Sequence, residues 1–214
     1  MFYCQLSPKG RKQSLIASAL AVMVVLSISL ISVRAVSIGN EKQAAVINQI
    51  NDSTPIKSGS SDGIWLTGDS VILGIKSVLA QQHAVGLVNA RVGRQAPELL
   101  QVIIHDKPTA STGPVVLNLG NNNALTEDEV VAILDELKDR SRVILVNTAV
   151  PRPWREKNNE LIAQISARYP NVKVIDWASI SEGHPEYFAP DGVHLVPTGV
   201  AIYVAEISKY PALS

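Results

Sequence analysis

In the stretch Ile64-Trp65-Leu66-Thr67-Gly68-Asp69-Ser70, a short apolar run is followed by residue types that commonly begin a helix. The run has the length of a buried strand, and Val71–Gln82 after it carries apolar residues at helical spacing. The stretch therefore predicts a strand followed directly by a helix, with the hydroxyl of Ser70 where one ends and the other begins.

The same alternation of apolar runs and amphipathic stretches continues to the C-terminus. Further strands are predicted at Val85–Asn89, Val115–Leu119, Val143–Val146 and Val172–Ile175. Helices are predicted at Ala96–Asp106, Glu127–Asp139, Asn158–Tyr169 and Pro197–Tyr210. Strands separated by helices favour parallel pairing with right-handed crossovers. The sequence therefore predicts a three-layer α/β/α sandwich around a five-stranded parallel sheet.

The N-terminal part has a different composition. Residues 14–33 carry no charge, and at about 1.5 Å per residue a helix of this length spans roughly 30 Å, enough to cross a bilayer. Residues 1–13 contain Lys9, Arg11 and Lys12, which predicts that they stay in the cytoplasm. We therefore expect a single-pass signal anchor that places the rest outside the cytoplasm. A cleaved secretory signal stays open, because Val33 and Ala35 suit a signal peptidase.

Residues 34–62 are rich in Asn, Gln, Ser, Lys and Gly, which predicts a stalk between the membrane segment and a domain at 63–214. The only cysteine, Cys4, precedes the apolar run, so the exported part is expected to lack disulfides. The net charge of the 214-residue chain is zero, and no long run of one sign occurs. This composition argues against a nucleic-acid partner.

Ser70, Asp191 and His194 are candidates for a catalytic triad. A serine hydroxyl needs an imidazole to take its proton, and the imidazole needs a carboxylate that orients it. Asp191 lies three residues before His194 in a turn that contains Gly192. Ser61 fits the G-x-S-x-G pattern but lacks a preceding strand, so it is rejected. The other histidines, at positions 83, 105 and 184, are expected in surface or helix-end roles.

The negative charge that develops during acyl transfer needs hydrogen-bond donors. The backbone N–H of Ser70, the backbone at Gly93 and the side-chain amide of Asn122 are the candidates, because all three follow predicted strands. No pairing of histidines has metal-ligand spacing, and no Gly-rich phosphate loop occurs, so no metal or cofactor is predicted.

Taken together, these residues resemble the SGNH (GDSL-like) hydrolase superfamily over about 63–210, which implies a flavodoxin-like sheet. Ser70, Gly93, Asn122 and the pair of Asp191 and His194 match its conserved blocks. The resemblance is closer to the extracytoplasmic domain of acyltransferases that O-acetylate peptidoglycan and other envelope polysaccharides. The strings that carry it are Gly68-Asp69-Ser70-Val71, Val92-Gly93-Arg94-Gln95, Pro151-Arg152-Pro153-Trp154, Asp176-Trp177 and Asp191-Gly192-Val193-His194-Leu195.

The resemblance implies a serine-dependent O-acetyltransferase of cell-wall glycan, with an acetyl-serine intermediate. Such proteins usually carry many membrane helices, whereas one is predicted here, so a separate membrane acyltransferase is an expected partner. An acetyl esterase or general GDSL-type esterase is the alternative, and a wall-binding domain without catalysis is a third. Trp154 and Trp177 are candidates for sugar stacking or for the core. The third block, Gly120-Asn121-Asn122-Asn123, departs from the usual Gly or Asp after the asparagine.

Overall fold

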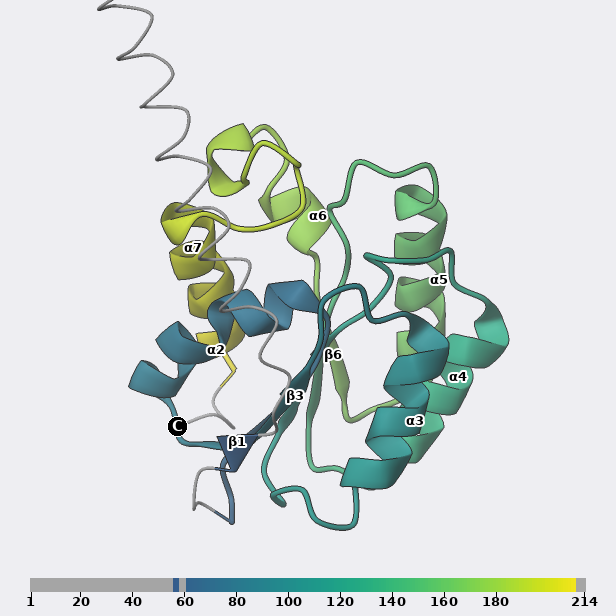
Figure 1. Cartoon of the computed structure of the whole chain (residues 1–214). Helices are drawn as coiled ribbons and strands as arrows, with labels where there is room; N and C mark the ends of the chain where they lie inside the picture. The colour runs from purple at the N-terminus through teal and green to yellow at the C-terminus, as the bar shows by residue number, and fades with distance from the viewer. Residues whose placement is uncertain (1–55, 58–60, 211–214) are drawn as a thin grey trace, which may run out of the picture. The chain divides into compact units, whose positions relative to one another are not determined.

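A six-stranded sheet with the order β1-β3-β2-β4-β5-β6 forms the centre of the domain (Figure 1). The computed structural model describes residues 56–57 and 61–210. All neighbouring strands pair in parallel except β1, which pairs antiparallel with β3. The strands are β1 (Ile56–Lys57), β2 (Ile64–Gly68), β3 (Val85–Ala90), β4 (Val115–Asn118), β5 (Val143–Val146) and β6 (Val172–Ile175).

Helices cover both faces of this sheet, as Figure 1 shows. α2 and α7 pack against each other on one face, and α3, α4 and α5 pack side by side on the other. The two short helices α6 and η1 lie between β6 and α7 in the chain. The helices are α2 (Ser70–Gln82), α3 (Ala96–Asp106), α4 (Glu127–Glu136), α5 (Arg155–Ser166), α6 (Trp177–Ile180), η1 (Pro185–Tyr187) and α7 (Pro197–Ser208).

Side chains of the central strands alternate between two separate cores. Leu66 and Val116 pack in the core under α2 and α7, whereas Trp65 and Leu117 pack in the core under α3, α4 and α5. Successive residues of a strand point to opposite faces, so apolar residues at every position are needed to cover both sides. This is why the strands are continuous apolar runs in the sequence.

The topology reverses at β2, which places the serine at a natural site for a ligand. Counting the five parallel strands in chain order, their arrangement is 2-1-3-4-5, because β3 lies on one side of β2 and β4 on the other. In such sheets a crevice opens at the carboxyl ends of the strands where the order reverses. Ser70 follows β2 at this point.

The predicted three-layer sandwich with five parallel strands is confirmed, and three details differ. The structure adds β1 at one edge, within the segment expected to be a stalk. α4 ends at Glu136 because Leu137, Lys138 and Arg140 turn into tighter i→i−3 hydrogen bonds. α5 begins at Arg155, where the N–H of Asn158 already donates to the carbonyl of Trp154.

The predicted cytoplasmic segment, the membrane span at 14–33 and most of the stalk lie outside the described residues. Within the part that the structure describes, no helix is both long enough and apolar enough to cross a bilayer.

Candidate active site

Ser70, His194 and Asp191 form a hydrogen-bonded chain although 121 positions separate the serine from the aspartate. His194 Nε2 lies 3.0 Å from Ser70 Oγ, and His194 Nδ1 lies 2.7 Å from Asp191 Oδ2. Since the carboxylate can only accept at Nδ1, the hydrogen-bond network assigns the neutral ring a proton there. Nε2 is then free to accept the serine proton, which is the arrangement a serine nucleophile requires.

The turn that carries Asp191 is built by local hydrogen bonds. Asp191 Oδ1 accepts from the N–H of Val193 at 2.9 Å and from the N–H of His194 at 3.0 Å. Gly192 adopts φ +68° and packs on Pro151, a conformation that a side chain would strain. Partial burial raises the pKa of Asp191, but these hydrogen bonds and the one from His194 outweigh it and hold its pKa below the usual value. Asp191 therefore stays an anion that can stabilise an imidazolium.

Ser70 is the first residue of α2 and is 5% exposed. Asp69 caps the helix, because its side chain accepts from the N–H of Val71 at 2.9 Å. Within the described residues no hydrogen bond occupies the backbone N–H of Ser70 or that of Gly93. Gly93 has φ +72°, and a methyl group added there would meet open space. The two N–H groups are therefore available to a ligand.

The three asparagines after β4 tie their loop to its neighbours. Asn121 and Asn122 donate to Asp69 Oδ2 at 2.9 and 3.0 Å, and Asn123 accepts from the N–H of Ala96 at the start of α3. The Asn122 amide also donates to the carbonyl oxygen of Arg94 at 3.2 Å. Both of its hydrogens are thus engaged, so a contact from Asn122 to an oxyanion requires one of them to be shared.

The two tryptophans that are candidates for sugar stacking differ in burial. Trp177 is 3% exposed and packs edge-on against Tyr203, with ring centroids 4.9 Å apart, so its face is not open to a sugar. Trp154 is half-buried, and its Nε1–H donates to the carbonyl of Gly120 at 3.1 Å. Of the two alternatives that the sequence left open, core packing therefore applies to Trp177.

The other candidate groups lie apart from the serine. His184 pairs with Glu186 at 2.8 Å on the surface, and His105 pairs with Asp106 at 2.9 Å. His83 contacts Ser208, whose hydroxyl donates to a helix carbonyl. Among residues 56–57 and 61–210, no three His, Cys, Asp or Glu side chains gather closely enough to hold a metal ion.

Comparison with known proteins supports the resemblance, although no protein-family model matches the chain. Over 143 residues, 66% of this chain, the sequence is 40% identical to the peptidoglycan O-acetyltransferase OatA of Listeria monocytogenes. The C-terminal catalytic domain of Streptococcus pneumoniae OatA, solved with a methylsulfonyl adduct, matches with a TM-score of 0.59 and 23% identity over 71% of this chain and 93% of that one. A GDSL-like lipase from Bacteroides thetaiotaomicron matches with a TM-score of 0.56 and 20% identity over 79% and 96%.

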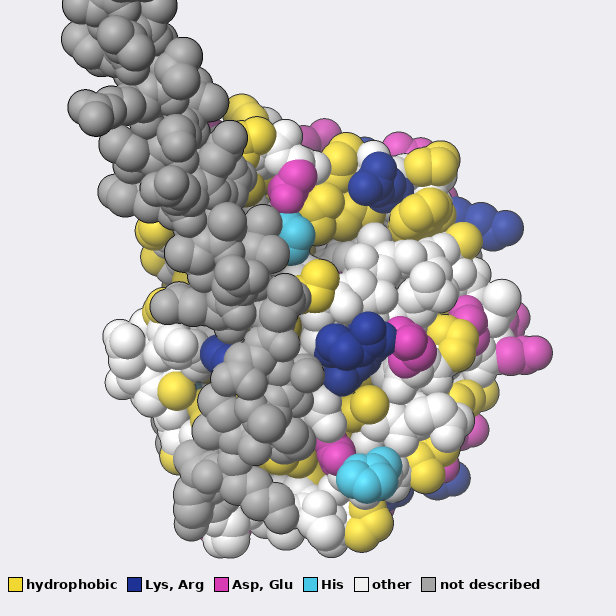
Figure 2. Space-filling model, in the orientation of Figure 1, with side chains coloured by type: hydrophobic (Ala, Val, Ile, Leu, Met, Phe, Trp, Pro, Cys, Tyr) yellow, Lys and Arg dark blue, Asp and Glu magenta, His cyan; other side chains and the backbone are white. Residues whose placement is uncertain are grey.

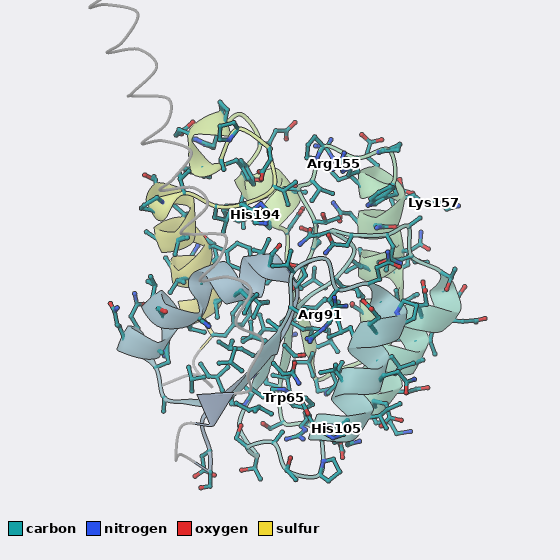
Figure 3. The ribbon with its side chains drawn as sticks, viewed as in Figure 1. Trp65, Arg91, His105, Arg155, Lys157 and His194 are labelled. Atoms are coloured by element: carbon teal, nitrogen blue, oxygen red, sulfur yellow. The ribbon has the colours of Figure 1, made fainter. Side chains whose placement is uncertain are left out.

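In sequence the chain is similar to peptidoglycan O-acetyltransferases, and in fold it is similar to GDSL-like enzymes. The match covers only 23% of the Listeria protein's length, so the chain corresponds to less than a quarter of that relative. The SGNH blocks provide Ser70, Gly93, Asn122 and His194, and the fold brings all four to the carboxyl ends of the strands. Figure 3 shows His194 near α6 and α7, above α2 in this view.

The buried polar residues beneath this site were not predicted from the sequence. Asp69 is 3% exposed and accepts hydrogen bonds from Asn118, Asn121 and Asn122 in addition to the N–H of Val71. Burial raises the pKa of Asp69, against the lowering effect of the hydrogen bonds from Asn118, Val71 and Asn121. The one available signal was Asn118, a polar residue that ends an otherwise apolar strand.

Proposed function

We propose that this domain is a serine-dependent O-acetyltransferase that acts on cell-wall glycan, with peptidoglycan as the substrate class. The observation that carries the proposal is the hydrogen-bonded chain from Asp191 through His194 to Ser70. The 40% identity to a peptidoglycan O-acetyltransferase supports the choice of acyl group and acceptor.

In the first half-reaction, His194 Nε2 takes the proton as Ser70 Oγ attacks the carbonyl carbon of an acetyl donor. The oxygen of the tetrahedral intermediate receives hydrogen bonds from the N–H groups of Ser70 and Gly93 and from the amide of Asn122. Asp191 stabilises the imidazolium of His194. The bond to the donor's leaving group then breaks, and His194 returns the proton to that leaving group. Acetyl-Ser70 remains.

In the second half-reaction, a sugar hydroxyl gives its proton to His194 and attacks the acetyl carbonyl. Collapse of the second intermediate forms the sugar ester, and Ser70 Oγ recovers the proton from His194. Water in place of the sugar gives hydrolysis, which is the esterase alternative. The same side chains serve both outcomes, so the acceptor that reaches the acetyl-serine determines the product.

The proposal extends to location. The apolar run at 14–33 would anchor the chain in the cell membrane, with the domain at 63–214 outside the cytoplasm. A donor made in the cytoplasm would then need a separate membrane acyltransferase to carry acetyl groups across. A cleaved signal would release the same domain.

The test uses the full chain, purified in mild detergent, with a chromogenic acetyl ester and with or without chito-oligosaccharides. Mass spectrometry of the sugars is expected to show added acetyl groups that depend on Ser70. If the sugars do not change the rate of acetate release and no acetylated sugar forms, the domain is an esterase and the transferase proposal is wrong.

A further inference from the structure

Arg94 is a buried cation that contacts three segments of the site. The residue is 8% exposed although it follows Gly93 in a loop between β3 and α3. Its guanidinium donates to the carbonyl oxygens of Gly68 and Asn89 at 3.1 and 2.6 Å, and to Asn89 Oδ1 at 2.9 Å. The proposed mechanism gives this residue no part in acyl transfer.

Arg94 contacts or adjoins a group next to each candidate oxyanion donor. The carbonyl of Gly68 lies two residues before Ser70, and Arg94 itself is bonded to Gly93. The carbonyl oxygen of Arg94 accepts the hydrogen bond of the Asn122 amide at 3.2 Å. One residue thus connects the segments that carry all three donors, and these segments are otherwise far apart in the sequence.

The charge of Arg94 is balanced within the domain. Burial and the positive charge of Arg91 lower the pKa of Arg94, and the negative charges of Glu98, Asp106 and Asp69 oppose this effect. Asp106, 5% exposed, accepts from the Asn89 amide at 2.6 Å, and the oxygen of that amide accepts from Arg94. This relay orients the amide of Asn89, which in turn fixes the guanidinium.

We propose that Arg94 is a positioning residue that holds the Ser70 N–H, the Gly93 N–H and the Asn122 amide at the spacing an oxyanion requires. The inference rests on the proposed acyl-transfer function. It assigns Arg94 no contact with substrate. A planar guanidinium satisfies two carbonyls and an amide oxygen at once, whereas the single ammonium of lysine lacks this fixed fork.

The test compares Arg94→Lys with a matched control, Arg91→Lys, in the full chain. Arg91 lies three residues earlier on the same loop, but its side chain is 45% exposed and pairs with Glu98 at 2.6 Å. Figure 3 places Arg91 near the middle of the face where Figure 2 shows exposed basic side chains. Arg94→Lys keeps the buried charge, so it is the variant that retains the fold. Circular dichroism and thermal unfolding establish the folded fraction.

With an acetyl ester, Arg94→Lys is expected to lower kcat by about 10²-fold with little change in KM, the order of effect expected when an oxyanion donor is displaced. Arg91→Lys is expected to leave both constants within about twofold, because exposed pairs contribute little. Combining Arg94→Lys with Asn122→Ala should cost less than the product of the single losses, since both act on one set of donors.

A thionoester provides the readout that a merely structural role would not change. Its C=S group is a poor acceptor for the oxyanion donors, so wild type should prefer the oxygen ester strongly. A loosened set of donors reduces this preference, and Arg94→Lys is expected to show a smaller oxygen-to-sulfur ratio of kcat/KM. An unchanged ratio, with both substrates slowed equally, would overturn the proposal.

Labelling of Ser70 by a sulfonyl fluoride separates the failure of this inference from that of the proposed function. If wild type is labelled at Ser70 but turns over no acetyl ester, the proposed acyl-transfer function is wrong. The positioning role of Arg94 is then tested by the rate of Ser70 labelling alone. Slower labelling of folded Arg94→Lys than of Arg91→Lys then supports positioning. Equal labelling rates would contradict it.

Discussion

The two halves of the candidate site are built in opposite ways. The half around Ser70 rests on buried polar residues, among them Asp69 and Asn118, and its polar groups bond to one another across segments far apart in the sequence. The half around His194 is local and exposed, with side chains of Asp191 and His194 that are 49% and 37% accessible. The difference indicates that the nucleophile and the oxyanion donors are fixed by the core, whereas the base is held by one turn facing solvent.

The oxyanion donors and the base have different chemical requirements, and the two halves match them. Donors for a developing oxyanion act best when they are oriented in advance, which the hydrogen bonds among buried polar groups beside Ser70 provide. A base must exchange protons with donors and acceptors that enter and leave, which an exposed half allows. The arrangement suits an acyl-transfer site whose acceptor, a glycan hydroxyl or water, arrives from solvent.

The largest expected effect is at the junction of the two halves. Ser70→Ala is expected to lower kcat for an acetyl ester by about 10⁵-fold or more, because it removes the nucleophile. Ser61→Ala is the matched control, since Ser61 lies in the G-x-S-x-G pattern but its hydroxyl donates to the neighbouring Asp62 at 3.3 Å and to no other group in the described residues. Equal activity of Ser70→Ala and Ser61→Ala would show that Ser70 is not the nucleophile.

Asp191→Asn is expected to lower kcat by about 10³- to 10⁴-fold, because the amide favours the wrong ring tautomer of His194. Glu186→Gln provides the control, since Glu186 forms an equally short pair with His184 on the surface. We expect it to keep activity. Steady-state kinetics of both variants measures the difference between the two pairs, and thermal unfolding confirms that each variant is folded at the assay temperature.

Asp69→Asn tests the buried half through stability. The carboxylate accepts hydrogen bonds from three asparagine amides and one backbone N–H. Asp69→Asn replaces one carboxylate oxygen by an NH2 group, whose hydrogens would face the hydrogens of these donors. The free energy of unfolding is expected to fall by about 1–3 kcal/mol or more. Urea unfolding measures it. A loss as small as that of Asp191→Asn would show that the two halves do not differ in this way.

The smallest effect is a pH dependence at the exposed half. The pKa of Asp191 is lowered by folding, so its contribution to stability is present above the unfolded value near 3.8 and is lost as the pH falls through the folded pKa. The free energy of unfolding of wild type should therefore be about 0.2–1 kcal/mol higher than that of Asp191→Asn at pH 7, the range typical of exposed ion pairs. Urea unfolding below the folded pKa should show no such difference.

The two halves also differ in how far the sequence predicts them. The Asp191 turn is local, so three-residue spacing and Gly192 were enough to place the carboxylate at the imidazole. The strand before Ser70 and most helices followed from apolar periodicity. Asp69 and Arg94 were given no role, because their partners, Asn118 and Asn89 among them, come from other strands. The short α6 and η1 lack enough residues to show a period.

The central claim is that Ser70 carries the acetyl group. Mixing the full chain with an activated acetyl ester, quenching in acid and mapping peptides by mass spectrometry tests it directly. The account predicts one added acetyl group on Ser70 in wild type, accumulation of that species in a variant that cannot deacylate, and none in Ser70→Ala. Turnover with acetyl on another residue, or undiminished turnover by Ser70→Ala, would contradict it.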